Sequence, residues 1–169
     1  VSLMPTGLTR SMRRDELVDL VCFLSLLGKD ERFRVPSRRM VAMWEVFEPS
    51  ESLGMGLQSA DAARHVVEAD DVHWKSVFGT VSGQLPLREI PAFDRLGFVR
   101  FHLTSTKDGP SDLLLPDGDA RGLSFWLGDA PLAAGPRIRI DAAAGQQTVF
   151  VGVDLAQRTE PLAIEIEAP

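Results

Sequence analysis

Short runs of alternating apolar and polar residues, separated by turn residues, follow one another after residue 95 and limit the fold more than any other feature. Alternation with a period of two is typical of strands that bury one face. Gly128-Asp129 lies between two of these runs and predicts a tight hairpin turn. Several short strands joined by Gly, Pro and Asp turns predict a mainly β fold, an antiparallel β-sandwich of the jelly-roll type. The predicted strands are Leu96–Thr104, Leu123–Leu127, Ala130–Ala133, Ile138–Ile140, Thr148–Val153 and Leu162–Ile166.

Two further strands are predicted upstream, at residues 38–47 and at His73–Val81, because apolar residues alternate there as well. Between them, residues 57–69 predict a short helix. The sandwich is therefore expected to span residues 38–169. The polar stretch 30–37, which contains a proline, is expected to be a linker.

A helix that begins between Ser11 and Arg14 is predicted close to the N-terminus, and Asp19 and Ser25 are the only polar residues in it between Leu17 and Leu27. A helix that is apolar all round must be covered on more than one side. We therefore expect residues 1–29 to be the C-terminal loop and helix of a larger domain that this sequence contains only in part. Without the rest of that domain, the helix is expected to fold back onto the sandwich, to self-associate with a second copy or to pack in a crystal contact. The apolar residues are Leu17, Val18, Leu20, Val21, Cys22, Phe23, Leu24, Leu26 and Leu27.

Charge and hydropathy exclude some classes of partner. The formal net charge is -6 at pH 7 and the pI is about 5.0, so we expect no binding to nucleic acid. The longest apolar run is too short to form a transmembrane segment. The single cysteine, Cys22, rules out an intrachain disulfide. Its place in an apolar helix predicts a small buried hydrophobe rather than a nucleophile.

No set of residues in the sequence has the spacing of a catalytic or metal site. His65, His73 and His102 are far apart and show none of the usual ligand spacings. The Gly-x-Ser-x-Gly motif of serine hydrolases is absent, and no acid and base pair stands out. Asp117 and Asp119 flank a glycine as in a calcium loop, but the further acidic ligands are missing, so a solvated turn is predicted. The chain is therefore expected not to be an enzyme.

The tryptophans offer a candidate for ligand binding. Core packing is the default for Trp44, Trp74 and Trp126 in a domain without tyrosine. Trp126 alternates with Phe125, however, so that one of the two must point away from the core. Trp74 and Trp126 are the candidate ligand-binding residues, and a sugar-binding face is the ligand site that they would form.

The segment before the helix contains a candidate haem ligand, Met4, because a thioether on a loop before a packed helix can coordinate a haem iron. LMPTGL at residues 3–8 and RDELVDLVCFLS at residues 14–25 resemble the end of the c-type cytochrome domain of large multidomain proteins from planctomycetes. The resemblance implies that Met4 is the distal haem ligand of such a domain. The Cys-x-x-Cys-His motif that attaches haem in that family is absent here. Haem c is therefore expected in the intact parent protein, and no cofactor is expected in this fragment.

The rest of the chain resembles the carbohydrate-binding-like or PA14-like β-sandwich that follows such a cytochrome domain. The segments that carry this resemblance are RRMVAMWEVFEPS, GLSFWLGDAPL and IRIDAAAGQQTVFVGVDLAQR. The two resemblances together imply an extracytoplasmic electron-transfer protein, similar to a membrane-bound dehydrogenase, in the periplasm or at the cell surface. This chain would be its non-catalytic accessory or interaction module, and the parent an oxidoreductase.

Two alternative functions remain. The sandwich could be a carbohydrate-binding module with polysaccharide as its partner, which predicts an exposed aromatic platform or a groove of tryptophans and acids. It could instead be a purely structural domain that caps the upstream cytochrome domain, which predicts a large contact between the helix and the sheet and no ligand-sized pocket.

Overall fold

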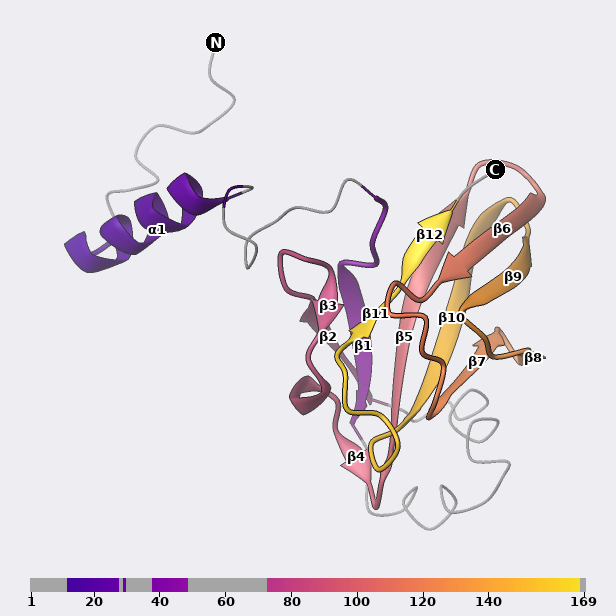
Figure 1. Cartoon of the computed structure of the whole chain (residues 1–169). Helices are drawn as coiled ribbons and strands as arrows, with labels where there is room; N and C mark the ends of the chain where they lie inside the picture. The colour runs from indigo at the N-terminus through magenta and orange to yellow at the C-terminus, as the bar shows by residue number, and fades with distance from the viewer. Residues whose placement is uncertain (1–11, 28, 30–37, 49–72, 168–169) are drawn as a thin grey trace. The chain divides into compact units, whose positions relative to one another are not determined.

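The chain divides into two compact units, Val1–Val35 and Pro36–Pro169. The described part of the first unit forms the helix α1 (Arg14–Leu26), and the described strands belong to the second unit (Figure 1). Within the described part of the chain, no helix is long and apolar enough to cross a membrane. The computed structural model describes residues 12–27, 29, 38–48 and 73–167.

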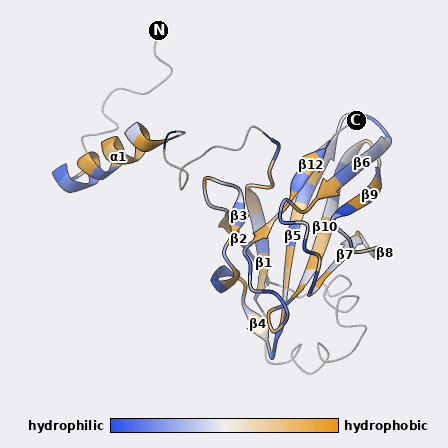
Figure 2. Ribbon diagram, in the orientation of Figure 1, coloured by the Kyte–Doolittle hydropathy of each residue, from blue (hydrophilic) through white to orange (hydrophobic). Residues whose placement is uncertain are grey.

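Helix α1 begins after Arg13, whose backbone N–H donates a hydrogen bond to Glu16 Oε2 at 2.8 Å. Asp15 and Glu16 place negative charge at the positive end of the helix dipole, which favours a start at this point. The helix ends where the backbone N–H of Leu27 donates to the carbonyl of Phe23 at 3.0 Å. Figure 2 shows a hydrophilic start followed by a mostly hydrophobic helix.

No residue of α1 is buried, and Val18, Val21 and Leu24 are each more than half exposed. Cys22 is exposed as well. The prediction that it is a small buried hydrophobe is therefore wrong, because the helix that carries it presents no buried side. The apolar pattern of this helix correctly predicted its type but not its burial.

The larger sheet has the strand order β2-β1-β5-β10-β7-β8, and β4 pairs with β5 at the end of that strand. All of these pairings are antiparallel. The hairpin between β7 and β8 turns at Gly128, whose φ of 59° is readily adopted only by glycine. The strands are β1 (Met43–Glu48), β2 (His73–Phe78), β4 (Ala92–Phe93), β5 (Leu96–Ser105), β7 (Leu123–Leu127), β8 (Ala130–Leu132) and β10 (Gly145–Asp154).

The second layer combines the sheet β12-β6-β9 with the pair β11-β3. Residues before β1 connect these pieces: the backbone N–H of Val41 donates to Ile164 O at 2.9 Å, and that of Ile166 donates to Arg39 O at 2.8 Å. A short 3-10 helix, η3 (Leu87–Glu89), follows β3. The strands of this layer are β3 (Gln84–Leu85), β6 (Gly109–Leu114), β9 (Arg137–Ala142), β11 (Leu162–Ala163) and β12 (Glu165–Glu167).

The core lies between the two layers, and the predicted fold class, an antiparallel β-sandwich with an N-terminal helix, is confirmed. Val99, Phe101 and Leu103 of β5 face residues of the second layer such as Leu113 and Ile140. Trp44 of β1 is completely buried in this core, and its ring meets that of Phe101 edge to face at 5.4 Å. Among the described residues, its Nε1 is the buried side-chain polar atom that lacks a hydrogen-bond partner.

Several elements differ from the sequence prediction, among them the short β3, η3 and β4, which were not predicted. Strand β6 was missed, because Gly, Pro and Asp in GPSDLL are poor strand formers; its place between β12 and β9 makes it a strand. The strand predicted at residues 38–47 is divided between the layers, since Met40 pairs with Glu165 while β1 begins at Met43. The strand predicted at Leu162–Ile166 is interrupted and forms β11 and β12. The helix predicted at residues 57–69 lies outside the described residues.

Candidate functional site

The face of the larger sheet that points away from the core is rich in aromatic side chains. Side chains alternate along a strand, so Phe47, Phe98 and Phe150 point away from the core that their neighbours Val46, Val99 and Val151 enter. The strand register brings further rings beside them: Trp74 lies opposite Phe47, and Trp126 lies opposite Phe150.

Ring contacts connect these strands. The ring of Trp74 is 5.9 Å from that of Phe150 and 5.7 Å from that of Phe47, distances typical of packed aromatic pairs. Phe47, Phe98 and Phe150 are buried, whereas Trp74 and Trp126 are half-buried. We call the side of the sheet on which Trp74, Phe150 and Trp126 lie the aromatic face; its accessible part comes from the two tryptophans.

A charged cluster lies beside Trp74 on the same side of the sheet. The guanidinium of Arg100 stands over the Trp74 ring, 4.3 Å from the ring centroid, which is a cation–π contact. Arg100 Nε also donates to Glu45 Oε2 at 2.5 Å. Both side chains are about three-quarters buried, so that this ion pair is partly shielded from water. Arg100 therefore fixes the position of both the tryptophan ring and the carboxylate.

His102 lies two residues after Arg100 on β5, on the same side of the sheet, and extends the cluster. Its Nε2 is 3.5 Å from Glu45 Oε2, and its Nδ1 lies 3.1 Å from the hydroxyl of Thr148 on β10. The cluster thus presents a carboxylate, an imidazole and a hydroxyl at the edge of the aromatic face. These groups can donate and accept hydrogen bonds, as orienting groups in binding sites do.

Gly152 allows Trp126 to lie close to the sheet. A Cβ atom at this position would come within 3.3 Å of Trp126 Cη2 and Cζ3 and of Phe98 Cε1. Residue 152 lies between these two rings on β10, and only a residue without a side chain leaves them room. The glycine therefore determines how near the two rings approach each other across the sheet.

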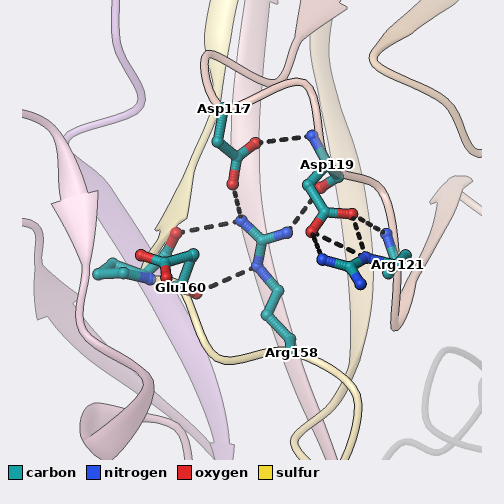
Figure 3. A network of polar contacts seen from close by, with 6 residues as sticks. Asp117, Asp119, Arg121, Arg158 and Glu160 are labelled. Carbon is teal, nitrogen blue, oxygen red and sulfur yellow. Dashed lines mark hydrogen bonds and ion pairs between the residues drawn. The ribbon is translucent and has the colours of Figure 1, made fainter.

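The loop from Asp117 to Arg121 does not have the properties of a metal site. Figure 3 shows the guanidinium of Arg158 between Asp117 and the backbone of the neighbouring loop. Arg158 donates to Asp117 Oδ2 at 2.5 Å, to Asp119 O at 2.6 Å and to the carbonyls of Glu160 and Pro161. The Asp117 carboxylate is thus paired with a guanidinium and is not free to bind a calcium ion.

The carboxylate of Asp119 accepts hydrogen bonds from a different arginine, Arg121. Arg121 donates to this carboxylate through the side chain, at 2.8 Å from Nη2 to Oδ2, and through the backbone, at 2.9 Å from N to Oδ1. These hydrogen bonds, the side-chain bond first, lower the pKa of Asp119 from 3.8 to about 2. Within the described ranges no group of three His, Cys, Asp or Glu side chains is placed to hold a metal ion.

The structure brings together two of the three predicted site residues. Trp74 and Trp126 lie on the aromatic face, on either side of Phe150. The remaining tryptophan, Trp44, was not a predicted site residue and is buried in the core. Met4 lies outside the described residues, as does His65. His73 is exposed at the start of β2, 3.6 Å from Glu48.

The charged cluster and Arg158 were not identified from the sequence. Alternation along β5 does place Arg100 and His102 on one side, which was a usable signal for the cluster. The partner Glu45 comes from β1, and only the register between β1 and β5 shows that it lies opposite Arg100. No local pattern marks Arg158 as buried.

No family model matches this sequence, and no curated protein matches it either. The resemblances to a cytochrome domain and to a carbohydrate-binding-like sandwich therefore stay predictions.

Proposed function

We propose that the β-sandwich is a non-catalytic binding module that holds saccharide rings against the aromatic face. The observation that carries this proposal is the position of Trp74 and Trp126 on one face of one sheet, with Phe150 between them. Aromatic rings offer flat apolar surface with little loss of side-chain freedom on binding. The C–H face of a pyranose ring matches such a surface.

The charged cluster provides the polar half of such a site. Sugar hydroxyls need donors and acceptors whose orientation is fixed before binding. Glu45 is held by Arg100, and His102 is held by Thr148, so these side chains lose little freedom when a ligand binds. Aromatic surface beside a carboxylate and an imidazole favours a saccharide over a purely apolar ligand.

The test is affinity electrophoresis of the full chain in gels that contain soluble polysaccharides, together with a glycan array. We expect retardation by at least one polysaccharide. Trp126→Ala and Trp74→Ala should each weaken binding by about tenfold or more. Arg139→Ala, which removes an exposed side chain from β9 in the other layer, should bind as the wild type does.

Circular dichroism and urea unfolding of each variant separate lost binding from lost folding. Folded tryptophan variants with unchanged affinity would overturn the proposal. A wild-type chain that no glycan retards would do so as well, and would favour the purely structural role.

A second proposal concerns α1, and its support is the exposed apolar surface of Val18, Val21 and Leu24. We propose that α1 is the last helix of a cytochrome c-like domain, with Met4 as the distal haem ligand. Extracytoplasmic electron transfer by haem c in the parent protein, with the upstream cytochrome domain as partner, forms part of this proposal. Self-association through α1 is the alternative use of the same surface.

The residues of this chain do not fit covalently attached haem. Cys22 is the single cysteine, and attachment needs two cysteines and an adjacent histidine. We therefore derive no electron-transfer step from these residues. The gene sequence upstream of the codon for Val1 tests the proposal: a Cys-x-x-Cys-His motif some tens of residues earlier supports it, and an open reading frame without one contradicts it.

A further inference from the structure

A second polar site lies at the hairpin between β5 and β6, far along β5 from the aromatic face. A cleft of about 320 Å³ opens there, with Leu103 and Ile166 as its apolar lining. We call it the hairpin cleft. Because β5 belongs to the larger sheet and β6 to the second layer, their hairpin joins the layers at one end of the sandwich (Figure 1). Thr104, Ser105 and Lys107 at this hairpin line the cleft. Its polar lining consists of Arg39, Thr104, Ser105, Thr106, Lys107 and Ser111.

The side chain of Ser111, a residue that pairs through its backbone with Ile140 of β9, makes no hydrogen bond in the described part of the protein. It is only 8% exposed, and its hydroxyl makes no hydrogen bond with a described residue, although it lines the hairpin cleft. The hydroxyl faces the cleft without a protein partner, so it is free to donate a hydrogen bond to a group bound there. Ser105, by contrast, donates to Lys107 O at 2.6 Å and thereby shapes the turn.

Two positive charges line the same cleft without a counter-ion. Neither Arg39 nor Lys107 forms an ion pair with any described residue. Their neighbours are neutralised: Arg38 pairs with Glu165 at 3.1 Å, and Arg137 pairs with Asp112 at 2.7 Å.

The nearby carboxylates are occupied by other groups. Glu167 lies 3.1 Å from Arg137, and Asp108 accepts the backbone N–H of Ala144 at 2.6 Å. A chain with a net charge of -6 thus holds two cations without a described ion pair and one hydroxyl without a described partner around one cleft.

We propose that the hairpin cleft binds the sulfate or phosphate group of a small molecule, with Arg39 and Lys107 as the charged contacts and the Ser111 hydroxyl as a hydrogen-bond donor. Arginine and lysine together with hydroxyl donors are the groups that recognise tetrahedral oxyanions. The cleft is larger than the anion alone, so it also has room for part of the group that carries it. This proposal does not depend on saccharide binding at the aromatic face.

The test is a titration of the full, isotope-labelled chain followed by NMR, with inorganic phosphate, inorganic sulfate and a monosaccharide sulfate as probes. Chloride at equal ionic strength is the reference. We expect saturable shifts at Arg39, Lys107 and Ser111, with a dissociation constant of about 1 mM or tighter for at least one probe. If the monosaccharide sulfate binds more tightly than the inorganic ions, the ligand is an anion attached to a larger molecule. If the inorganic ions bind as tightly, the ligand is the free anion.

Matched variants make the result decisive. Ser111→Ala removes a hydroxyl that has no described protein partner, so it should fold normally and bind about tenfold more weakly. Arg39→Gln and Lys107→Gln should each weaken binding at least as much. Arg139→Gln, which removes an exposed charge outside the cleft, should leave binding unchanged.

Shifts that do not saturate, or that are equal in chloride, would overturn the proposal. It would also be overturned if Arg139→Gln weakened binding as much as Arg39→Gln does, or if folded Ser111→Ala bound as tightly as the wild type.

Discussion

Arg158 is the most deeply buried charged residue of the described chain, at 3% exposure. A buried charge is tolerated only when its partners satisfy it, and four oxygen atoms do so here, one of them from Asp117. The guanidinium ties the loop before β7 to the loop after β10. A single side chain therefore stabilises the connection between two segments far apart in the sequence.

Removing the Arg158 side chain should destabilise the sandwich strongly. Arg158→Ala leaves several carbonyls without a donor, so we expect the free energy of unfolding to fall by about 3 kcal/mol. Urea unfolding followed by circular dichroism measures this. Arg121→Ala, in the loop before β7 that Arg158 contacts, is the matched control, and the loss of its exposed side chain should cost far less. Equal losses from the two substitutions would contradict the assigned role of Arg158.

The titration of Asp119 should reveal its hydrogen bonds with Arg121. Its pKa is lowered from 3.8 to about 2, so the stabilising contribution of the carboxylate is complete above the unfolded value and is lost as the pH falls through about 2. NMR titration of the side-chain carboxyl should give a midpoint near 2 in the wild type. In Arg121→Ala the midpoint should move back toward 3.8. A wild-type midpoint near 3.8 would show that the ion pair does not persist in solution.

At the scale of elements, the strands bury their apolar residues and the helix leaves its apolar residues exposed. Strands such as β5 and β10 bury one face in the core and place aromatic residues on the other. Helix α1 has a similar apolar content but buries none of it. A helix of 13 residues is marginal by itself in water. Helix α1 is therefore the element that most needs a partner to cover its exposed apolar surface.

Without another partner, α1 should cause the chain to self-associate. Burying a Leu side chain contributes about 1.5–3 kcal/mol, so Leu24→Lys should shift the chain toward the monomer. Sedimentation equilibrium at micromolar concentration measures the change. Ser25→Lys introduces the same charge at a neighbouring polar position and should leave association unaltered. A wild-type chain that is monomeric throughout would rule out this use of the helix.

At the scale of the whole molecule, the sandwich has a complete core of its own. All residues of the buried cluster lie between Val41 and Ile164, within the second compact unit. The aromatic face and the hairpin cleft are both built from residues of this unit alone. Both proposed binding sites should therefore survive when the first unit is removed.

A chain that begins at Pro36 should fold with the same stability as the sandwich in the full chain. We expect the urea midpoint and the denaturant slope of its unfolding transition to be unchanged, because no residue of the core cluster is lost. The full chain is the reference in the same experiment. A loss of more than about 1 kcal/mol would show that the first unit stabilises the second.

The sequence by itself determined the fold class and most of the strands, because alternation and turn residues are local properties that each strand carries. It also identified Trp74 and Trp126 as candidates for a binding face, although core packing was the default expectation for all three tryptophans. Register and layering decided that question: Trp44 enters the core only because β1 lies next to β5 with that side inward.

Tertiary structure alone decided the remaining features. GPSDLL is a strand because β12 and β9 lie on either side of it. Arg158 is buried because two loops meet around it, and the hairpin cleft exists because Arg39 and Ser111 meet at one end of the sandwich. Each of these features depends on contacts between residues that are distant in the chain, and a local sequence pattern does not predict such contacts.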